Sequence, residues 1–225
     1  PAFGVHLGCF DNEAKMLSPD TVSIKNLFHI PDAAKTLVLK PEPRLCPGIV
    51  IDKSSDIILS GITLHHAGGM GILGQNSSNI SLLDVHIGVR KGSGRLISVS
   101  DDAAHFAQCS GKVLLERCSF QNQWDDGVNI HGIYRKFRKR GEPMLEAGHF
   151  QQFGVPMARV GERLEIGDFH MKLKMITELN KQYSVFSTER PLPEIPDGAP
   201  VMNLDRQPDV IIRECRFAGN KPRGV

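Results

Sequence analysis

Residues 80–87 read Ile-Ser-Leu-Leu-Asp-Val-His-Ile, and this octet carries the pattern that decides the fold. Apolar side chains occupy its first, third, sixth and eighth positions, and the polar Asp84 separates the two apolar pairs. Alternation of apolar and polar residues is typical of a β-strand with one buried face. The octet therefore predicts a strand, a corner at Asp84 with a shift of one residue, and a second short strand.

The same octet recurs along the chain, which indicates a repeat architecture. Its copies begin at Val22, Ile57, Ile80, Val113 and Val210, and the first copy is the weakest because His29 takes its last apolar position. The step of 23 residues from Ile57 to Ile80 suits one coil of a parallel β-helix. Such coils stack at roughly 4.8 Å around a shared apolar interior. We therefore predict an all-β protein built on a right-handed parallel β-helix.

The step of 97 residues from Val113 to Val210 is too long for one coil. Residues 132–207 contain further alternating runs with turn-forming residues between them, and without these 76 residues the step falls to 21. We expect three parts: parallel β-helix coils over 1–131, an inserted small antiparallel β-barrel or sheet over 132–207, and a return to the β-helix over 208–225. The basic run 135–140 inside the insertion reads as a solvated, charged loop or as a contact for an acidic partner. We also expect the β-helix to continue beyond residue 225.

Composition excludes several classes of protein. The 225 residues include 27 basic and 25 acidic side chains, a formal charge of +2, so nothing global points to nucleic acid or to a membrane surface. No apolar run approaches the ~20 residues of a membrane span. The five cysteines show no metal-ligand spacing and signal no disulfide framework. Cys118 and Cys215 occupy the same position of the octet, so we expect them to stack inside the β-helix.

The stretch 122–132, Asn-Gln-Trp-Asp-Asp-Gly-Val-Asn-Ile-His-Gly, carries the strongest chemical signal. Asp125 and Asp126 are adjacent, and a regular strand would point them to opposite faces. Gly127 suggests a bend just after the pair that brings both carboxylates to one surface. Neighbouring carboxylates repel, so one of them should keep its proton to higher pH. The plain alternative is a polar turn between two strands.

Asp102 precedes Asp126 by 24 residues, close to the length of one plain coil. Stacking would therefore place Asp102 beside Asp125 and Asp126 on one side of the β-helix. Three gathered carboxylates cost electrostatic free energy unless a ligand, a metal or shared protons compensate. The spacing thus predicts an acidic pocket with these three residues as the catalytic candidates.

Six further residues are candidates for substrate binding, and each has a structural alternative. Trp124 suits a sugar-stacking platform or the core, while His105, flanked by apolar residues, suits substrate contact or a buried hydrogen bond. Asn129 suits the site or a stacked amide ladder, and His131 suits ligand contact or a strand end. Arg95 and Arg223 suit substrate hydroxyls or ion pairs with the acids.

Several long stretches together resemble glycoside hydrolase family 110. These are HAGGMGILGQNSSNISLLDV (66–85), GRLISVSDDAAHFAQCSGKVLLERCSF (94–120), NQWDDGVNIHG (122–132) and NKPRGV (220–225). The likeness covers most of 56–132 and resumes at 208–225. Members of this family are inverting exo-α-galactosidases that act on terminal α-1,3-linked galactose, including the blood-group B type. The insertion is similar to the small β-barrel of such enzymes, although this chain is much shorter than the family's usual length.

The resemblance implies roles for the three aspartates. Asp102 matches the aspartate of the family's D-A-x-H-F segment, and Asp125 and Asp126 match its D-D pair. It implies Asp125 as the general acid to the leaving oxygen, with Asp102 and Asp126 holding and deprotonating the attacking water. It further implies no metal and no cofactor, a glycan substrate with terminal α-galactose, and a secreted or periplasmic protein. The sequence neither requires nor excludes a homo-oligomer.

Two other functions fit the same scaffold. One is a polygalacturonase-like or calcium-dependent lyase-like β-helix enzyme, although a polyanionic substrate would call for more basic residues around the acids. The other is a non-catalytic glycan-binding or structural β-helix.

Overall fold

The computed structural model describes residues 14–25, 46–147, 156–220 and 223–225. Within these ranges the secondary structure consists of β-strands and no helix, so the expectation of an all-β protein is confirmed. None of the described residues belongs to a helix long and apolar enough to cross a membrane. The chain divides into two compact units, Pro1–Lys40 and Pro41–Val225.

The described part of the first unit is an antiparallel hairpin of β1 (Ala14–Ser18) and β2 (Thr21–Ile24). The prediction of a parallel coil beginning at Val22 is therefore wrong for these residues, because Val22 pairs with Met16 in the antiparallel sense. Residues of β2 are largely exposed, so this weakest copy of the octet has no buried face to stack. The rest of the copy, residues 26–29, lies outside the described residues.

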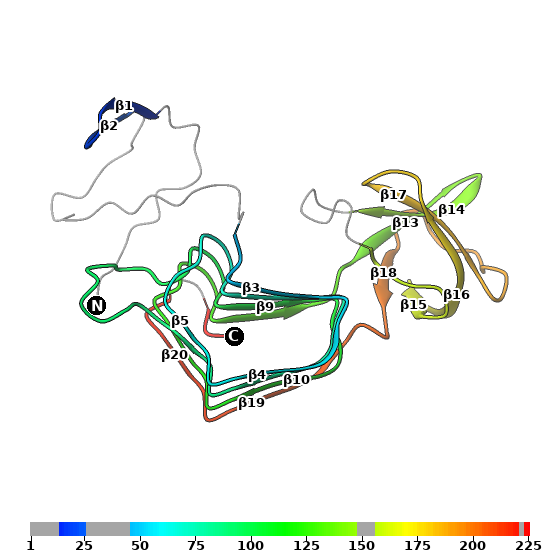
Figure 1. Cartoon of the computed structure of the whole chain (residues 1–225). Coiled ribbons are helices and arrows are strands. Elements are labelled where there is room, and N and C mark those ends of the chain that lie inside the picture. The colour runs from blue at the N-terminus through cyan, green and yellow to red at the C-terminus, as the bar shows by residue number, and fades with distance from the viewer. Residues whose placement is uncertain (1–13, 26–45, 148–155, 221–222) are drawn as a thin grey trace. The chain divides into compact units, whose positions relative to one another are not determined.

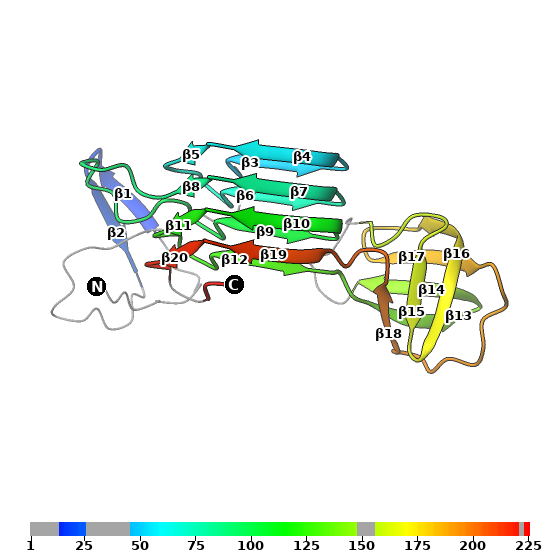
Figure 2. The ribbon, with the colours of Figure 1, turned by 90° about the horizontal axis from the view of Figure 1, so that it is seen from below.

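The second unit begins with strands that repeat in groups of three, here called rungs. The first rung is β3 (Ile49–Asp52), β4 (Ser55–Ser60) and β5 (Thr63–Leu64); the second is β6 (Ile72–Gln75), β7 (Ser78–Leu83) and β8 (His86–Ile87). The third is β9 (Ala104–Ala107), β10 (Ser110–Glu116) and β11 (Ser119–Gln121); the fourth is β12 (Val128–His131), β19 (Asp209–Arg213) and β20 (Arg216–Ala218). Each rung gives one strand to each of three four-stranded parallel sheets (Figures 1 and 2).

The register of these sheets follows the octet. Val113 lies opposite Ile80 on one side and opposite Val210 on the other, so residues 97 apart in sequence are neighbours in space. In the sheet of β12 and β9, Val128 lies opposite Ala104. The stacking of the octet copies from Ile57 onward is therefore confirmed.

The polar or glycine position of the octet is the corner between two strands. Its residue has a positive φ in all four rungs: 65° at Gly61, 53° at Asp84, 52° at Arg117 and 54° at Glu214. This left-handed conformation turns the chain between the two strands and shifts the alternation by one residue. The same backbone conformation thus explains why the octet breaks at this position in these four copies.

The rungs enclose one apolar core. Ile80 and Leu82 from the second rung and Phe106 and Leu115 from the third are fully buried. Val210 of the fourth rung is 45% exposed, because a residue of an outer rung has a neighbouring strand on one side only. The expected stacking of Cys118 and Cys215 is confirmed, since the backbone N–H of Cys118 lies 3.4 Å from the Sγ of Cys215, and both thiols are free.

Between β12 and β19 the chain forms a closed antiparallel barrel. Its strands are β13 (Arg135–Arg140), β14 (Glu142–Ala147), β15 (Arg163–Ile166), β16 (Phe169–Glu178), β17 (Tyr183–Thr188) and β18 (Pro200–Asn203). A second apolar cluster fills it, with Phe137, Leu145, Leu164 and Phe186 among its buried members. The alternating runs of the insertion are therefore strands, as expected.

The basic run 135–140 is strand β13 and not a loop. Arg135 and Phe137 are both buried, and burial lowers the pKa of Arg135 below its ordinary value. Arg138, on the opposite face, donates to the carboxylates of Glu146 at 2.5 Å and Asp197 at 2.8 Å. The interpretation as a solvated loop was wrong because the strand places Arg135 and Phe137 on its buried face, while Glu146 and Asp197 pair with Arg138 on the outer face.

Candidate active site

Two loops that precede β9 and β12 stack on one another. The N–H of Trp124 donates to the carbonyl of Val99 at 3.0 Å, and the N–H of Ala103 donates to the carbonyl of Asp126 at 3.0 Å. The N–H of Ser98 likewise donates to the carbonyl of Asn122 at 2.9 Å. These bonds continue the parallel pairing of the rungs beyond the strands, so they fix which residues of the two loops face each other.

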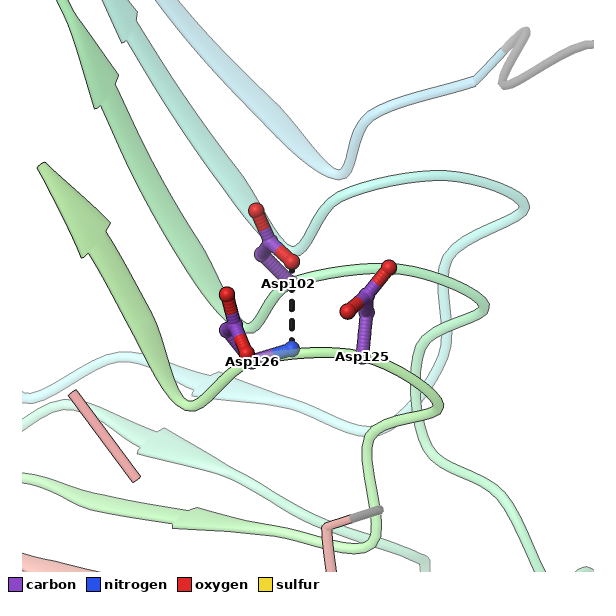
Figure 3. Close-up of side chains that lie close together, drawn as sticks. All are labelled: Asp102, Asp125 and Asp126. Carbon is purple, nitrogen blue, oxygen red and sulfur yellow. Dashed lines mark hydrogen bonds between the residues drawn. The ribbon is translucent and has the colours of Figure 1, made fainter. Parts of the chain in front are cut away.

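Asp102, Asp125 and Asp126 come together at this point, as their spacing predicts. One carboxylate oxygen from each lies within 4.8 Å of the others, and Figure 3 shows Asp125 and Asp126 on one loop and Asp102 on its neighbour. Asp102 and Asp126 are buried, with 2% and 3% of their surface exposed, whereas Asp125 is half-buried. The cluster therefore presents Asp125 toward solvent and holds the other two in the protein.

Asp102 accepts hydrogen bonds through both carboxylate oxygens. The backbone N–H of Asp126 donates to its Oδ1 at 3.1 Å, shown as the dashed line in Figure 3. The Nδ1 of His105 lies 2.6 Å from its Oδ2. Both oxygens of Asp102 thus have a hydrogen-bonding partner, and His105 donates to the carboxylate when its Nδ1 carries the proton.

Asp126 faces Arg223 from the far end of the chain. The guanidinium donates to Oδ2 at 2.8 Å and to Oδ1 at 3.1 Å, and the backbone N–H of Arg223 donates to Oδ1 at 3.2 Å. The hydrogen bond to Asp126, its charge, and the more distant charges of Asp125 and Asp102 raise the pKa of Arg223 above its ordinary value. Of the two interpretations of Arg223, the structure thus supports an ion pair with the acids.

Gly127 lies at a bend of the chain directly before β12, as expected, and the close approach of the next rung also requires a glycine there. It is absent from the described residues with positive φ, and a Cβ added to it would lie 2.3 Å from the carbonyl oxygen of Gly224. The N–H of Gly127 donates to the carbonyl of Arg223 at 2.9 Å. Glycine therefore lets the segment that carries Arg223 pack directly against the acidic loop.

The outer face of β9 and β12 carries three of the other candidates. His105 and Asn129 lie opposite each other in the register, and the Nε2 of His131 lies 3.0 Å from the Nε2 of His105. Both ring nitrogens of His105 therefore already have hydrogen-bonding partners, which favours the buried hydrogen-bond alternative over direct substrate contact. Asn129 has His105 opposite it and not another amide, so the alternative of an amide ladder is not supported in this sheet.

Arg95 and Trp124 lie in the loops. The guanidinium of Arg95 lies 2.8 Å from the Nδ1 of His66, so the contact found for it is a histidine and not an acid of the cluster. Trp124 is half-buried, directly before Asp125 in the chain. A sugar-stacking role for Trp124 remains a prediction.

Two features of the site escaped the sequence analysis. The Nδ1 of His66 lies 2.8 Å from the guanidinium of Arg95 and 2.9 Å from the carbonyl oxygen of Ser98. This nitrogen makes only one of the two hydrogen bonds at a time, because the first needs its lone pair and the second an N–H. His66 lies in a loop whose length differs from the next one. The contact between His105 and His131 was missed as well. The sequence does contain a signal for this contact, because the two histidines are 26 residues apart, two more than the 24-residue step between Asp102 and Asp126.

The same geometry is relevant to metals. Three carboxylate oxygens within 4.8 Å of one another can also hold a cation, and oxygen ligands suit Ca²⁺. The expectation of a metal-free site therefore stays a prediction.

Comparison with known proteins identifies relatives along most of the chain. An α-1,3-galactosidase A of Shewanella woodyi is 35% identical over 207 residues, which are 87% of this chain and 34% of the relative. An α-1,3-galactosidase B of Bacteroides thetaiotaomicron is 30% identical over 245 residues, 100% of this chain and 39% of the relative. An α-1,3-galactosidase A of Bacteroides fragilis is 35% identical over 236 residues, 95% of this chain and 38% of the relative.

The chain belongs to the family of these α-1,3-galactosidases. The resemblance to glycoside hydrolase family 110 is thereby confirmed. No protein-family model matches the chain. The chain spans between about a third and two fifths of the length of these family members, 34% to 39%.

Proposed function

We propose that the chain carries the catalytic centre of a glycoside hydrolase that removes terminal α-1,3-linked galactose from glycans. The observation that carries the proposal is the meeting of Asp102, Asp125 and Asp126 within 4.8 Å, in a chain related to α-1,3-galactosidases. Hydrolysis of a glycosidic bond needs an acid for the leaving oxygen and a base for water, and carboxyl groups supply both.

The roles follow from the partners of each acid. Asp102 and Asp126 accept hydrogen bonds from His105 and Arg223, which suits ionised groups that hold and deprotonate a water molecule. Asp125 is the most exposed of the three and is assigned as the general acid from the family resemblance. Trp124, Asn129 and Arg95 are proposed to bind the galactoside.

We further propose that the anomeric configuration is inverted. The oxygens of the cluster approach within 4.8 Å, which is shorter than the roughly 6.5–9.5 Å of a typical inverting pair. The 4.8 Å refers to the nearest oxygens and not to whole carboxyl groups, so it does not decide between retention and inversion; the two acids that face His105 and Arg223, together with the family resemblance, support an inverting attack by water. The anomer of the product distinguishes the two mechanisms.

The architecture and setting form part of the same proposal. Three parallel sheets whose strands follow one another rung by rung support a right-handed parallel β-helix, interrupted by the barrel between β12 and β19. The proposed division is β-helix up to residue 131, insertion over 132–207 and β-helix from 208. Export to the periplasm or the medium is proposed from the family resemblance alone.

The decisive experiment incubates the complete protein with linear and fucose-branched α-1,3-galactosides and follows the released sugar by NMR. Release of β-galactose as the first product is expected. Release of α-galactose would overturn inversion, and binding without release would favour the non-catalytic glycan-binding protein.

A second candidate is a calcium-dependent lyase, which the cation-compatible spacing of the three acids favours. It is separated from the first by a chelator. We expect galactose release to continue unchanged in EDTA, with inactive Asp125→Asn protein as the control. Cleavage of a galacturonan that stops in EDTA, returns with Ca²⁺ and yields unsaturated products would establish the lyase instead.

A further inference from the structure

A chain of three hydrogen bonds runs from the buried Asp102 of the cluster to the protein surface. Asp102 Oδ2 lies 2.6 Å from His105 Nδ1, His105 Nε2 lies 3.0 Å from His131 Nε2, and His131 Nδ1 lies 2.9 Å from the carbonyl oxygen of Gly132. Asp102 is buried and His131 is exposed. This chain of hydrogen bonds therefore connects Asp102, a proposed base, to solvent through two imidazole rings.

The number of protons in this chain of hydrogen bonds follows from the donor and acceptor groups that form it. Each hydrogen bond needs one proton, so three bonds need three protons. An ionised Asp102 and two neutral histidines would bring only two, one on each ring. The carbonyl of Gly132 only accepts, so His131 Nδ1 must carry a proton, and a second proton lies between Asp102 and His105. The contact between the two Nε2 atoms is then a hydrogen bond only if a third proton is present.

The third proton belongs on the histidines. The 2.6 Å separation of Asp102 and His105 is short even for a charge-assisted bond between nitrogen and a carboxylate, and such bonds are shorter than neutral ones. The side chains of His105 and Asp102 are only 12% and 3% exposed, and a buried carboxylate is stabilised by a cation at hydrogen-bonding distance. A positive charge shared by the two rings satisfies all three bonds and balances the charge of Asp102.

We propose that His105 and His131 share one proton between their Nε2 atoms and form a singly charged pair that positions Asp102. The inference rests on the proposed hydrolytic function and deepens it. His105 and His131 are positioning residues: they hold the carboxylate ionised and oriented toward the water that attacks the sugar. No bond to substrate is assigned to either ring.

The first test counts ring protons in the complete wild-type protein. With ¹⁵N-labelled histidine at neutral pH, NMR shifts of the four ring nitrogens should report three N–H protons over the two rings, with the Nε2 signals intermediate between protonated and bare nitrogen. Two neutral rings with one N–H each, or two fully charged rings, would overturn the proposal. This test needs no substrate, so it stands apart from the fate of the proposed function.

The second test is kinetic. His105→Gln should lower kcat by roughly 10- to 100-fold, because a displaced base is costly, while KM for the galactoside stays within about twofold. His131→Gln should lower kcat less and return His105 to a neutral ring in the NMR spectrum. His86→Gln, an exposed histidine of β8, is the matched control and should change neither value. A variant of His105 with unchanged kcat, or with the loss confined to KM, would refute the positioning role.

Discussion

The stacked rungs and the barrel each enclose an apolar core, but they pair their strands in different ways. In the rungs, each buried position of the octet repeats in the next rung, and one left-handed corner recurs at Gly61, Asp84, Arg117 and Glu214. In the barrel, closure comes from antiparallel pairs of unlike strands, with ion pairs such as Arg138–Glu146 on the outside. The comparison teaches that repetition fixes which loops meet, and the three aspartates lie where two such loops stack.

The sharpest test of this comparison exchanges an acid in each region. Asp126→Asn in the rungs should lower kcat for galactose release by roughly 10²- to 10⁴-fold, because it removes a carboxylate proposed to deprotonate water. Asp168→Asn changes an exposed turn residue of the barrel and should leave kcat as it is. Steady-state kinetics on both variants decide the matter; equal activities would break the link between the stacked loops and catalysis.

Core truncation should distinguish the two regions next. Phe106→Ala in the rungs and Phe186→Ala in the barrel each remove a fully buried ring, with an expected loss of roughly 3–5 kcal/mol of unfolding free energy. Because each rung rests on its neighbours, the first change should speed hydrogen exchange across β6, β9 and β12 and lower activity. The second should speed exchange in the barrel while the aspartate loops stay protected. Uniform exchange in both variants would show a single cooperative unit instead.

Glycine substitutions give a smaller and more specific contrast. Gly127 is limited by space, since an added Cβ would lie 2.3 Å from Gly224 O, whereas Gly141 of the barrel is limited by its φ of 81° with nothing within 4 Å. Asparagine tolerates a positive φ, so Gly141→Asn should be nearly neutral. Gly127→Asn should cost roughly 1–3 kcal/mol through overpacking and weaken the Arg223–Asp126 pair. Urea denaturation compares them, and equal losses would contradict the role assigned to Gly127.

The smallest effect concerns pH and the barrel. Hydrogen bonding by Tyr183, followed by pairing with Arg138, lowers the pKa of Glu146 from its ordinary 4.5. A carboxyl whose pKa is lower in the folded state stabilises the fold above its unfolded pKa, and this stabilisation is lost as pH falls through the folded pKa. Acid unfolding of the barrel should therefore begin below about 4.5 and shift to higher pH in Tyr183→Phe. Circular dichroism between pH 6 and roughly 2 follows it; an unchanged acid midpoint would remove Glu146 from the account.

Much of the rung structure could be predicted from the sequence because the octet recurs along the chain. Ile57, Ile80, Val113 and Val210 stack as their positions in the octet require. The copy at Val22 failed because an octet without a complete apolar face has nothing to bury, and a local hairpin satisfies its backbone instead.

The barrel was less predictable because it repeats nothing. Its alternating runs showed that strands exist, but antiparallel partners such as β13 and β18 come from distant segments that no spacing rule connects. Strand β13 was hidden by its charge, which pairs with acids only in the folded barrel.

The candidate site likewise has one part that could be predicted from the sequence and one part that could not. The meeting of Asp102 with Asp125 and Asp126 followed from one rung length. The contact of Arg95 with His66 depends on loops of unequal length and could not be read from spacing.

A crystal structure of the complete protein with galactose bound tests the central claim most directly. The account predicts the sugar ring over the stacked loops, with its anomeric carbon among the carboxylates of Asp102, Asp125 and Asp126. Galactose bound on another face, with none of the three aspartates within hydrogen-bonding distance of the ring, would contradict it.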